Sequence, residues 1–434
     1  MRLLPRWLFV CLLLVPSLLA AAEPAVQLSV TTDRPEALYS VGEQAGFLVK
    51  LSGDVASIEG SEVGFVLDKD GMPPVIEGKA KLEEGAARIE GTLGEPGFLR
   101  CRVTWKKADG KAQTAMAAAG FDPLKIAPSL PVPDDFDAFW AEQKARLAKV
   151  PMTPELTPVT SPIEEIEAFD VQIPCVEPRP VSGYFARPKG AAPKSLPAIL
   201  SVHGAGVRSS GLGSAVWAAK QYNALGMDIN AHGIPNGKPD EFYTALAEGE
   251  LKDYRAAGRD DRQTCYFLGM FLRLVRAMEF LASQPEWDGK ILIVQGSSQG
   301  GGQSIAAAGL DPRVTLIAAG VPAICDHSGK AAGRINGWPK LVPDENGVPN
   351  AKILEVARYF DAMNFATRAK AEAVVSVGFI DGTCPPTSVY AAYNNLPGKK
   401  QMTCEPLMGH TTFPSHQKAA AAAIAEHIAR LKAE

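Results

Sequence analysis

The chain has 434 residues, of which 46% are hydrophobic and 21% are charged. This is the composition of an ordinary folded protein, and it excludes the disordered, collagen-like and coiled-coil classes. The 44 basic and 48 acidic residues leave a formal net charge of −4 with no basic stripe, so we expect no nucleic-acid partner.

The first 22 residues have the features of a secretory signal peptide. Arg2 and Arg6 give a positively charged start, residues 8–15 form a short apolar run, and residues 20–22 are three alanines that suit cleavage. The apolar run is shorter than the roughly 20 residues of a membrane span. We therefore expect cleavage of residues 1–22, a secreted or periplasmic protein, and no membrane attachment of the mature chain. An uncleaved anchor is the alternative.

Residues 25–122 are predicted to form a small all-β domain, an immunoglobulin-like sandwich. Short runs of alternating apolar and polar residues are separated by Gly, Asp and Pro, namely 26–30, 45–51, 62–67, 87–93 and 98–105. This stretch contains no histidine and no cluster of catalytic residue types. We expect a structural spacer, with carbohydrate binding as the alternative role.

Residues 123–133 contain four prolines and are predicted to be a linker to a second domain, 134–434. That domain opens with a helix and an antiparallel strand pair. It then alternates helical stretches with continuous apolar strands, namely 197–202, 226–231, 290–295, 314–320, 373–380 and 401–407. This alternation predicts an α/β fold with a mostly parallel sheet covered by helices. The long insertion at 326–369 is expected to form a lid or a pocket wall.

Residues 295–301, Gln-Gly-Ser-Ser-Gln-Gly-Gly, carry a G-x-S-x-G motif with Ser298 at its centre. An apolar strand precedes the motif and a helix of small residues follows it, which is the setting of a nucleophile elbow in the α/β-hydrolase fold. Gly296 and Gly300 are needed because side chains in so tight a turn would collide with neighbouring backbone. The motif therefore predicts Ser298 as a nucleophile at the carboxyl end of a strand.

A serine hydroxyl needs a base to take its proton, and the base needs an acid to orient it. His410 follows the last predicted strand, and Asp381 directly follows the strand before it. The chain order Ser298, Asp381, His410 is the order of the triad in α/β-hydrolases. The alternatives are His416 as the base, and Asp326 or Asp361 as the acid.

The tetrahedral intermediate of acyl transfer needs N–H donors for its negative oxygen. We expect one from the backbone of Gln299, directly after the nucleophile, and one from Ala205, in the loop that follows the first apolar strand. His203 starts that loop and is expected to shape it instead of acting in catalysis. We expect the substrate pocket to include His203, His232, Trp338 and Pro385.

The second domain resembles the acetyl xylan esterase and cephalosporin C deacetylase family of carbohydrate esterases over residues 130–432. The resemblance rests on the motifs at 135–140, 203–204, 296–301, 381–386 and 409–410. It implies that Ser298, Asp381 and His410 are the triad, and that the protein removes acetyl groups from sugars without a metal. Members of the family often form closed ring oligomers, so a homo-oligomer is compatible with the resemblance.

Three positions depart from the pattern of that family. The family usually has Tyr at the position of Ala205, Arg-Gly-Gln at residues 232–234, which are His-Gly-Ile here, and Glu at the position of Thr411. The donor at 205 is a backbone group and survives the change of side chain. The departures therefore alter the substrate pocket more than the catalytic machinery.

These patterns together predict a secreted serine esterase that acts on acetylated carbohydrate of the xylan type through an acyl-enzyme, with no cofactor. Another carboxylester hydrolase or a serine peptidase on the same fold is the first alternative, because a fold does not select a substrate. A carbohydrate-binding scaffold with an inactive hydrolase domain is the second. A zinc deacetylase would need clustered His and Asp ligands, and the sequence has no H-x-x-x-H motif.

Removal of the signal would leave six cysteines without C-x-x-C spacing. Cys384 and Cys404 would be the first to pair in an oxidising compartment, because both follow predicted neighbouring strands. The alternative, given equal weight, is that all six cysteines are free thiols.

Overall fold

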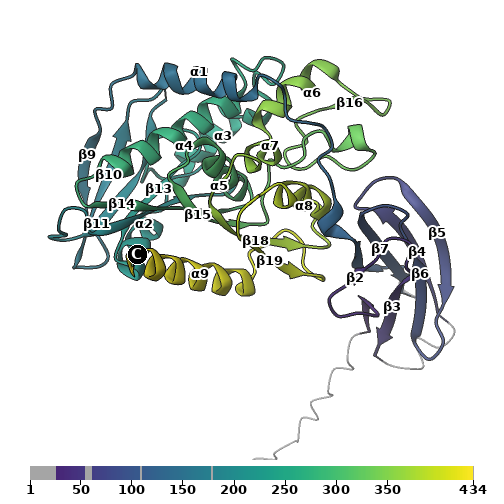
Figure 1. Ribbon diagram of the computed structural model, residues 1–434. Helices are drawn as coiled ribbons and strands as arrows, with labels where there is room; N and C mark the ends of the chain where they lie inside the picture. The colour runs from purple at the N-terminus through teal and green to yellow at the C-terminus, as the bar shows by residue number, and fades with distance from the viewer. Residues whose placement is uncertain (1–25, 54–60, 108–109, 177–178, 434) are drawn as a thin grey trace, which may run out of the picture.

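The structure is a computed structural model that describes residues 26–53, 61–107, 110–176 and 179–433. The predicted signal peptide lies outside these ranges. Figure 1 shows a small β-sandwich, coloured purple, beside a larger layered α/β part that runs from blue to yellow. Of the helices in the described ranges, none combines the length and the apolar character that a membrane crossing requires.

The sandwich consists of two sheets with strand orders β1-β3-β6 and β2-β8-β7-β4-β5. β2 and β8 run parallel, and the other neighbours run antiparallel. Strands consecutive in the chain are thus divided between two sheets, as in immunoglobulin-like domains, and the predicted class is confirmed. The strands are β1 (Gln27–Thr32), β2 (Leu38–Tyr39), β3 (Ala45–Ser52), β4 (Glu62–Lys69), β5 (Pro74–Lys81), β6 (Ala86–Gly91), β7 (Gly97–Lys106) and β8 (Ala112–Phe121).

Alternation along the strands supplies the sandwich core. In β3, the side chains of Phe47, Val49 and Leu51 are buried while Leu48 and Lys50 face outward. Because successive strand side chains point to opposite faces, this pattern places one apolar row between the sheets.

The α/β part has a nine-stranded sheet with the order β19-β18-β15-β14-β12-β13-β11-β10-β9. The strands from β13 to β19 in this order are parallel, and β11, β10 and β9 form an antiparallel edge. The fold is therefore the predicted α/β-hydrolase type. The strands are β9 (Glu155–Val159), β10 (Ile166–Ile173), β11 (Val181–Pro188), β12 (Leu196–Val202), β13 (Leu225–Ile229), β14 (Trp287–Ser297), β15 (Val314–Gly320), β18 (Glu372–Gly378) and β19 (Lys400–Glu405).

Helices cover both faces of this sheet. Helices α2 and α9 pack on one face, and α1, α4, α5 and α7 lie on the other, as Figure 1 shows. Alternate residues of the central strands serve the two faces: Ile199 and Ile293 contact the cluster with α2 and α9, whereas Leu200 and Val294 belong to the opposite cluster. The helices are α1 (Phe136–Ala148), α2 (Leu212–Tyr222), α3 (Asp240–Glu248), α4 (Tyr266–Ser283), α5 (Gln299–Leu310), α6 (Ala351–Ala357), α7 (Ala362–Ala366), α8 (Pro386–Asn394) and α9 (Pro414–Ala433).

The insertion after β15 is a packed wall of the α/β part. It contains the short pair β16 (Asp344–Glu345) and β17 (Val348–Pro349), together with α6 and α7. The carboxylate of Asp361 accepts hydrogen bonds from the backbone N–H groups of Asp326, His327 and Met363. These bonds and the burial of Phe365 anchor the insertion to the core, which favours the wall over the lid.

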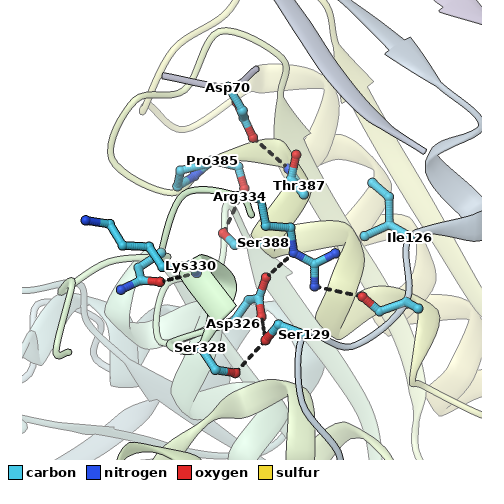
Figure 2. Close-up of polar contacts among 12 residues, drawn as sticks. Asp70, Ile126, Ser129, Asp326, Ser328, Lys330, Arg334, Pro385, Thr387 and Ser388 are labelled. Carbon is cyan, nitrogen blue, oxygen red and sulfur yellow. Dashed lines mark hydrogen bonds and ion pairs between the residues drawn. The ribbon is translucent and has the colours of Figure 1, made fainter. Parts of the chain in front are cut away.

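The sandwich and the α/β part meet in a seam along the linker, part of which Figure 2 shows. Arg334 donates to the backbone carbonyl of Ala127 at 2.7 Å and to the carboxylate of Asp326 at 2.8 Å. Ser129 also donates to Asp326, so the linker is bound to the insertion through one buried carboxylate. The domain limits 25–122, 123–133 and 134–434 stay predictions, although the elements of the two parts fall on either side of the linker.

The six cysteines of the described residues are free, which is the alternative that had equal weight with a pairing of Cys384 and Cys404. The Cys404 sulfur instead lies 3.3 Å from the hydroxyl oxygen of Tyr390. Cys384 is buried in the loop after Asp381.

Candidate active site

The nucleophile elbow joins the central strand β14 to α5. Ser298 has φ 59° and ψ −121°, a strained conformation with positive φ that a residue other than glycine rarely adopts. A Cβ atom on Gly296 would lie 2.4 Å from the carbonyl oxygen of Val202, and one on Gly300 would lie 2.1 Å from the same oxygen. The two glycines therefore let the elbow pack directly against the end of β12, as the motif predicts.

A chain of hydrogen bonds joins the three predicted residues. Nε2 of His410 is 2.9 Å from Oγ of Ser298, and Nδ1 of His410 is 2.7 Å from Oδ2 of Asp381. The other Asp381 oxygen accepts the backbone N–H groups of Thr383 and Cys384 at 2.8 and 2.9 Å. Because the carboxylate accepts from Nδ1–H, the lone pair of Nε2 faces the serine hydroxyl.

The alternative acids and base are held elsewhere. Asp361 caps α7, and Asp326 is paired with Arg334 at the seam. The His416 side chain is buried at the start of α9, and burial lowers its pKa to about 4. Within the described part of the chain, no hydrogen bond connects His416 to Ser298.

The loop after β12 lies beside Ser298. A Cβ atom on Gly204 would be 3.5 Å from Cβ of Ser298 and 3.3 Å from the carbonyl oxygen of Ser297. Ala205 is the next residue, and Gln299 is the first residue of α5, whose first-turn N–H groups lack partners within the helix. The two expected oxyanion donors thus lie on backbone segments that flank Ser298.

A buried network beneath this loop is a feature that sequence reasoning missed. Tyr254 donates its hydroxyl proton to Oε1 of Gln299 at 3.0 Å, and its ring stands edge-on to the ring of His232 at 4.7 Å. Nε2 of His232 donates to the Gly206 carbonyl at 3.1 Å, and Tyr266 contacts Nδ1 on the other side. The network connects residues 203–206, the expected oxyanion loop, to Gln299, the residue that follows Ser298. No sequence signal marked Tyr254, which lies in a short 3₁₀ turn, Tyr254–Ala256.

The four residues predicted to line the substrate pocket lie in different surroundings. His232 is fully buried, so it supports the oxyanion loop and does not line the pocket. Pro385 is also buried, at the start of α8. His203 lies in the oxyanion loop, where Nδ1 is 2.6 Å from the Gly204 carbonyl oxygen. Trp338 is half-buried in the insertion, with its ring 5.9 Å from the Arg255 guanidinium carbon.

A groove of about 650 Å³ lies between α2 and α9, and residues close in sequence to Ser298 and His410 line it. Ser297, which precedes the nucleophile, and Thr412, two residues after His410, both line it. Trp217 lies in the same groove with 48% of its surface exposed. The buried carboxylate of Asp228 also lines it and accepts the Gly211 N–H at 2.8 Å. An aromatic face beside hydrogen-bonding groups suits a sugar ring.

One group of metal-ligand types occurs among the described residues, and it overlaps the triad. The ligand atoms of Asp381, Cys384 and His410 lie within 4.8 Å of one another. The carboxylate and the imidazole already bond to each other, and burial raises the pKa of the Cys384 thiol well above its usual value. A thiolate is the metal-binding form of cysteine, so this donor set fits a protonated structural thiol better than a metal ligand.

A family comparison and a comparison with individual proteins agree with each other. Residues 123–428 match the family described as acetyl xylan esterase (AXE1). The chain is similar to the acetyl esterase Axe7A of Xylanibacter ruminicola, with 34% identity over 385 residues that cover 86% of this chain and 84% of that protein.

Two solved structures share the fold of the α/β part. The acetyl xylan esterase from Paenibacillus sp. R4 has a TM-score of 0.59 and 28% identity, over 70% of this chain and 97% of that one. Acetyl xylan esterase 1 from Thermoanaerobacterium sp. JW/SL YS485 has a TM-score of 0.57 and 22% identity, with the same coverage.

Proposed function

This chain belongs to the acetyl xylan esterase family and is an acetyl esterase, and from that premise we propose that it removes acetyl groups from carbohydrate through Ser298, His410 and Asp381. The observation that carries the proposal is the hydrogen-bond chain from the Ser298 hydroxyl through the imidazole to the buried Asp381 carboxylate. Such a chain gives a poor nucleophile its base and fixes the tautomer of that base.

The proposed reaction has two halves. Oγ of Ser298 bonds to the acetyl carbonyl carbon while Nε2 of His410 takes the hydroxyl proton. The bond from that carbon to the sugar oxygen then breaks, and His410 gives its proton to the departing oxygen. In the second half, His410 takes a proton from water, whose oxygen attacks the acetyl-enzyme. Acetate leaves, and the proton returns to Ser298.

The flanking backbone would stabilise the charged intermediate. The N–H groups of Gln299 and Ala205 are the proposed donors to the negative oxygen. Donors fixed in position before the reaction cost no reorganisation when charge develops. The family usually has Tyr at the position of Ala205. The change to Ala shortens the side chain and leaves the backbone N–H available.

Carbohydrate is the proposed source of the acetyl ester. The relatives are called acetyl esterase and acetyl xylan esterases, which supports an acetylated polysaccharide or oligosaccharide. The groove with Trp217 would hold sugar rings beside the triad. Replacement of Trp217 by alanine should therefore raise KM for acetylated oligosaccharide and leave KM for p-nitrophenyl acetate unchanged.

The test is acetate release from a panel of acetylated polysaccharides, with peptides and p-nitrophenyl acetate as comparison substrates. We expect acetate from at least one polysaccharide, its loss in Ser298→Ala, full activity in Ser283→Ala at the distant end of α4, and no effect of chelators. Activity in folded Ser298→Ala would overturn the triad. Faster cleavage of peptides would overturn the substrate class, and loss of activity on chelation would point to a metal.

We also propose export of the protein with removal of residues 1–22. The charged start, the apolar run and the alanines at 20–22 support it. The mass of the protein recovered from the medium or periplasm should correspond to a chain that starts at residue 23. A full-length chain in the membrane fraction would show the uncleaved anchor.

A further inference from the structure

The segment that carries Asp381 is contacted by the N-terminal sandwich on both sides of that residue. Phe98 of β7 packs edge-on against Phe379, two residues before Asp381, with ring centroids 4.9 Å apart. Asp70, at the turn between β4 and β5, accepts the backbone N–H of Thr387, six residues after Asp381, at 3.1 Å. Figure 2 shows Asp70 reaching across to Thr387.

Helix α8 needs this contact because its own start supplies no cap. Pro385 precedes the helix and Pro386 begins it, and no side chain of the helix start accepts a first-turn N–H. Thr387 is the first residue of α8 with an N–H to donate. An N-cap residue normally accepts a hydrogen bond from a backbone N–H in the first turn of its own helix. The carboxylate of Asp70 accepts such a bond for α8 from the sandwich.

Asp70 is held for this role by its own surroundings. It has φ 55°, and its neighbour Asp68 is fixed by two hydrogen bonds from Arg100, at 2.8 and 3.2 Å. Asp70 is 2% exposed, and its Oδ1 atom has no partner within the described part of the chain. Burial raises its pKa to about 7. A buried carboxylate with one unpaired oxygen is costly, so simple adhesion between the two parts is a poor explanation for it.

The seam has other contacts that hold the two parts together without Asp70. Asn394, at the opposite end of α8, donates to the carbonyl groups of Pro123 and Ile126 at 3.0 and 2.9 Å. Arg334 and Ser129 bind the linker to the insertion. The distinctive property of Asp70 is therefore its place beside the Asp381 loop, whose N–H groups at 383 and 384 orient the Asp381 carboxylate.

We propose that Asp70 is a positioning residue for the catalytic acid: by capping α8 from the sandwich, it fixes the 381–387 loop and so the carboxylate that orients His410. The sandwich is then a part of the active-site scaffold and more than a spacer. This inference rests on the triad given under the proposed function.

The test compares Asp70→Ala, Asp70→Asn and Asn394→Ala in the full chain, with p-nitrophenyl acetate. We expect Asp70→Ala to lower kcat roughly 10- to 100-fold, the cost typical of a misplaced catalytic group, with KM nearly unchanged. The apparent pKa of kcat/KM should also fall, because a displaced carboxylate stabilises the His410 imidazolium less. Asp70→Asn keeps an oxygen acceptor for Thr387 and should recover most of kcat.

Asn394→Ala is the matched control, since it removes two seam bonds from the same helix without touching the loop. It should keep the wild-type kcat and apparent pKa. Wild-type kcat and pH profile in Asp70→Ala would overturn the proposal, and so would equal losses in Asn394→Ala. If Asp70→Ala does not fold, Asp70→Ser, whose side chain is one atom shorter than that of Asp, takes its place, and wild-type kinetics in that variant would overturn the proposal too. Failure of the triad itself would appear separately, as activity in Ser298→Ala.

Discussion

The Tyr254 hydroxyl lies 3.0 Å from Oε1 of Gln299, the residue whose backbone N–H is proposed to stabilise the intermediate. This bond crosses from an irregular segment to the first turn of α5. It fixes the side chain of a residue whose main chain must be placed accurately for catalysis.

Tyr254→Phe should therefore lower kcat for p-nitrophenyl acetate, with little change in KM. The loss should be smaller than the roughly 10²- to 10³-fold effect of removing a direct oxyanion donor, because the phenol acts through Gln299. Tyr243→Phe is the matched control, since that hydroxyl bonds to residues 235 and 238, away from the elbow. Equal effects of the two variants would contradict a specific role for Tyr254.

Asp381→Asn tests the orientation of the base. An amide in place of the carboxylate can donate to Nδ1 of His410 and so favour the tautomer with its proton on Nε2, which cannot accept the Ser298 proton. We expect kcat to fall by about 10⁴ while the fold is retained. Steady-state kinetics and circular dichroism would check both parts, and an amide variant with near wild-type kcat would exclude Asp381 as the acid.

Gly300→Ala tests the packing of the elbow. The new Cβ would lie 2.1 Å from the Val202 carbonyl oxygen and 3.1 Å from the His203 carbonyl carbon. Both are backbone atoms, so we expect a loss of about 3 kcal/mol or more in the free energy of unfolding, the upper end for overpacking.

Gly213→Ala is the control for this change, because a Cβ there meets nothing within 4 Å and Gly213 lies in α2. It should leave stability unchanged or raise it by up to about 1 kcal/mol. Chemical denaturation of the two variants measures the difference. An elbow variant as stable as wild type would show that the glycine is not required by packing.

His232 should make the protein sensitive to acid. Burial lowers its pKa from 6.5 to about 3, so the folded protein holds it neutral where the unfolded chain binds a proton. Its contribution to stability is complete above about pH 6.5 and is lost as the pH falls toward 3. In His232→Gln, the thermal midpoint should therefore fall less between pH 7 and pH 5. An unchanged fall would assign the acid sensitivity to other groups.

The candidate triad residues could be identified from sequence because each comes after a predicted strand. β12, β15 and β18 are mostly apolar and buried, and β14 carries a buried apolar run at residues 291–294, because parallel strands covered on both faces are buried in their central parts. Predicted and observed limits agree within a few residues, and β15 agrees at both ends. Strand ends then place Ser298, Asp381 and His410 at one edge of the sheet.

The strands that sequence reasoning missed lack that signal. β8 is rich in alanine, which has no strand preference, and it forms only because β7 pairs along its whole length. β5 and β9 are edge strands with mostly exposed side chains, so their composition resembles that of a loop. The formation of these strands depends on pairing with strands that their own sequence does not reveal.

The supporting groups of the site could not be predicted for the same reason. Tyr254 and Asp70 lie in turns, and each contacts its partner across a large separation in sequence. His232 is predicted to line the pocket, but the ring turns inward to the Gly206 carbonyl. A one-dimensional pattern identifies the residues at strand ends and not the direction in which their side chains lie.

The apolar packing that the two parts share at the seam limits which N-terminal domains could replace the sandwich. Phe98 and Ala118 of the sandwich belong to the same buried cluster as Phe379 and Tyr390 of the α/β part. Removal of the sandwich would expose these aromatic side chains to water, at a cost of about 1.5–3 kcal/mol for each one uncovered. The sandwich is therefore not an interchangeable attachment. Recombination that exchanged it for an unrelated module would have to replace a matching surface as well as a linker.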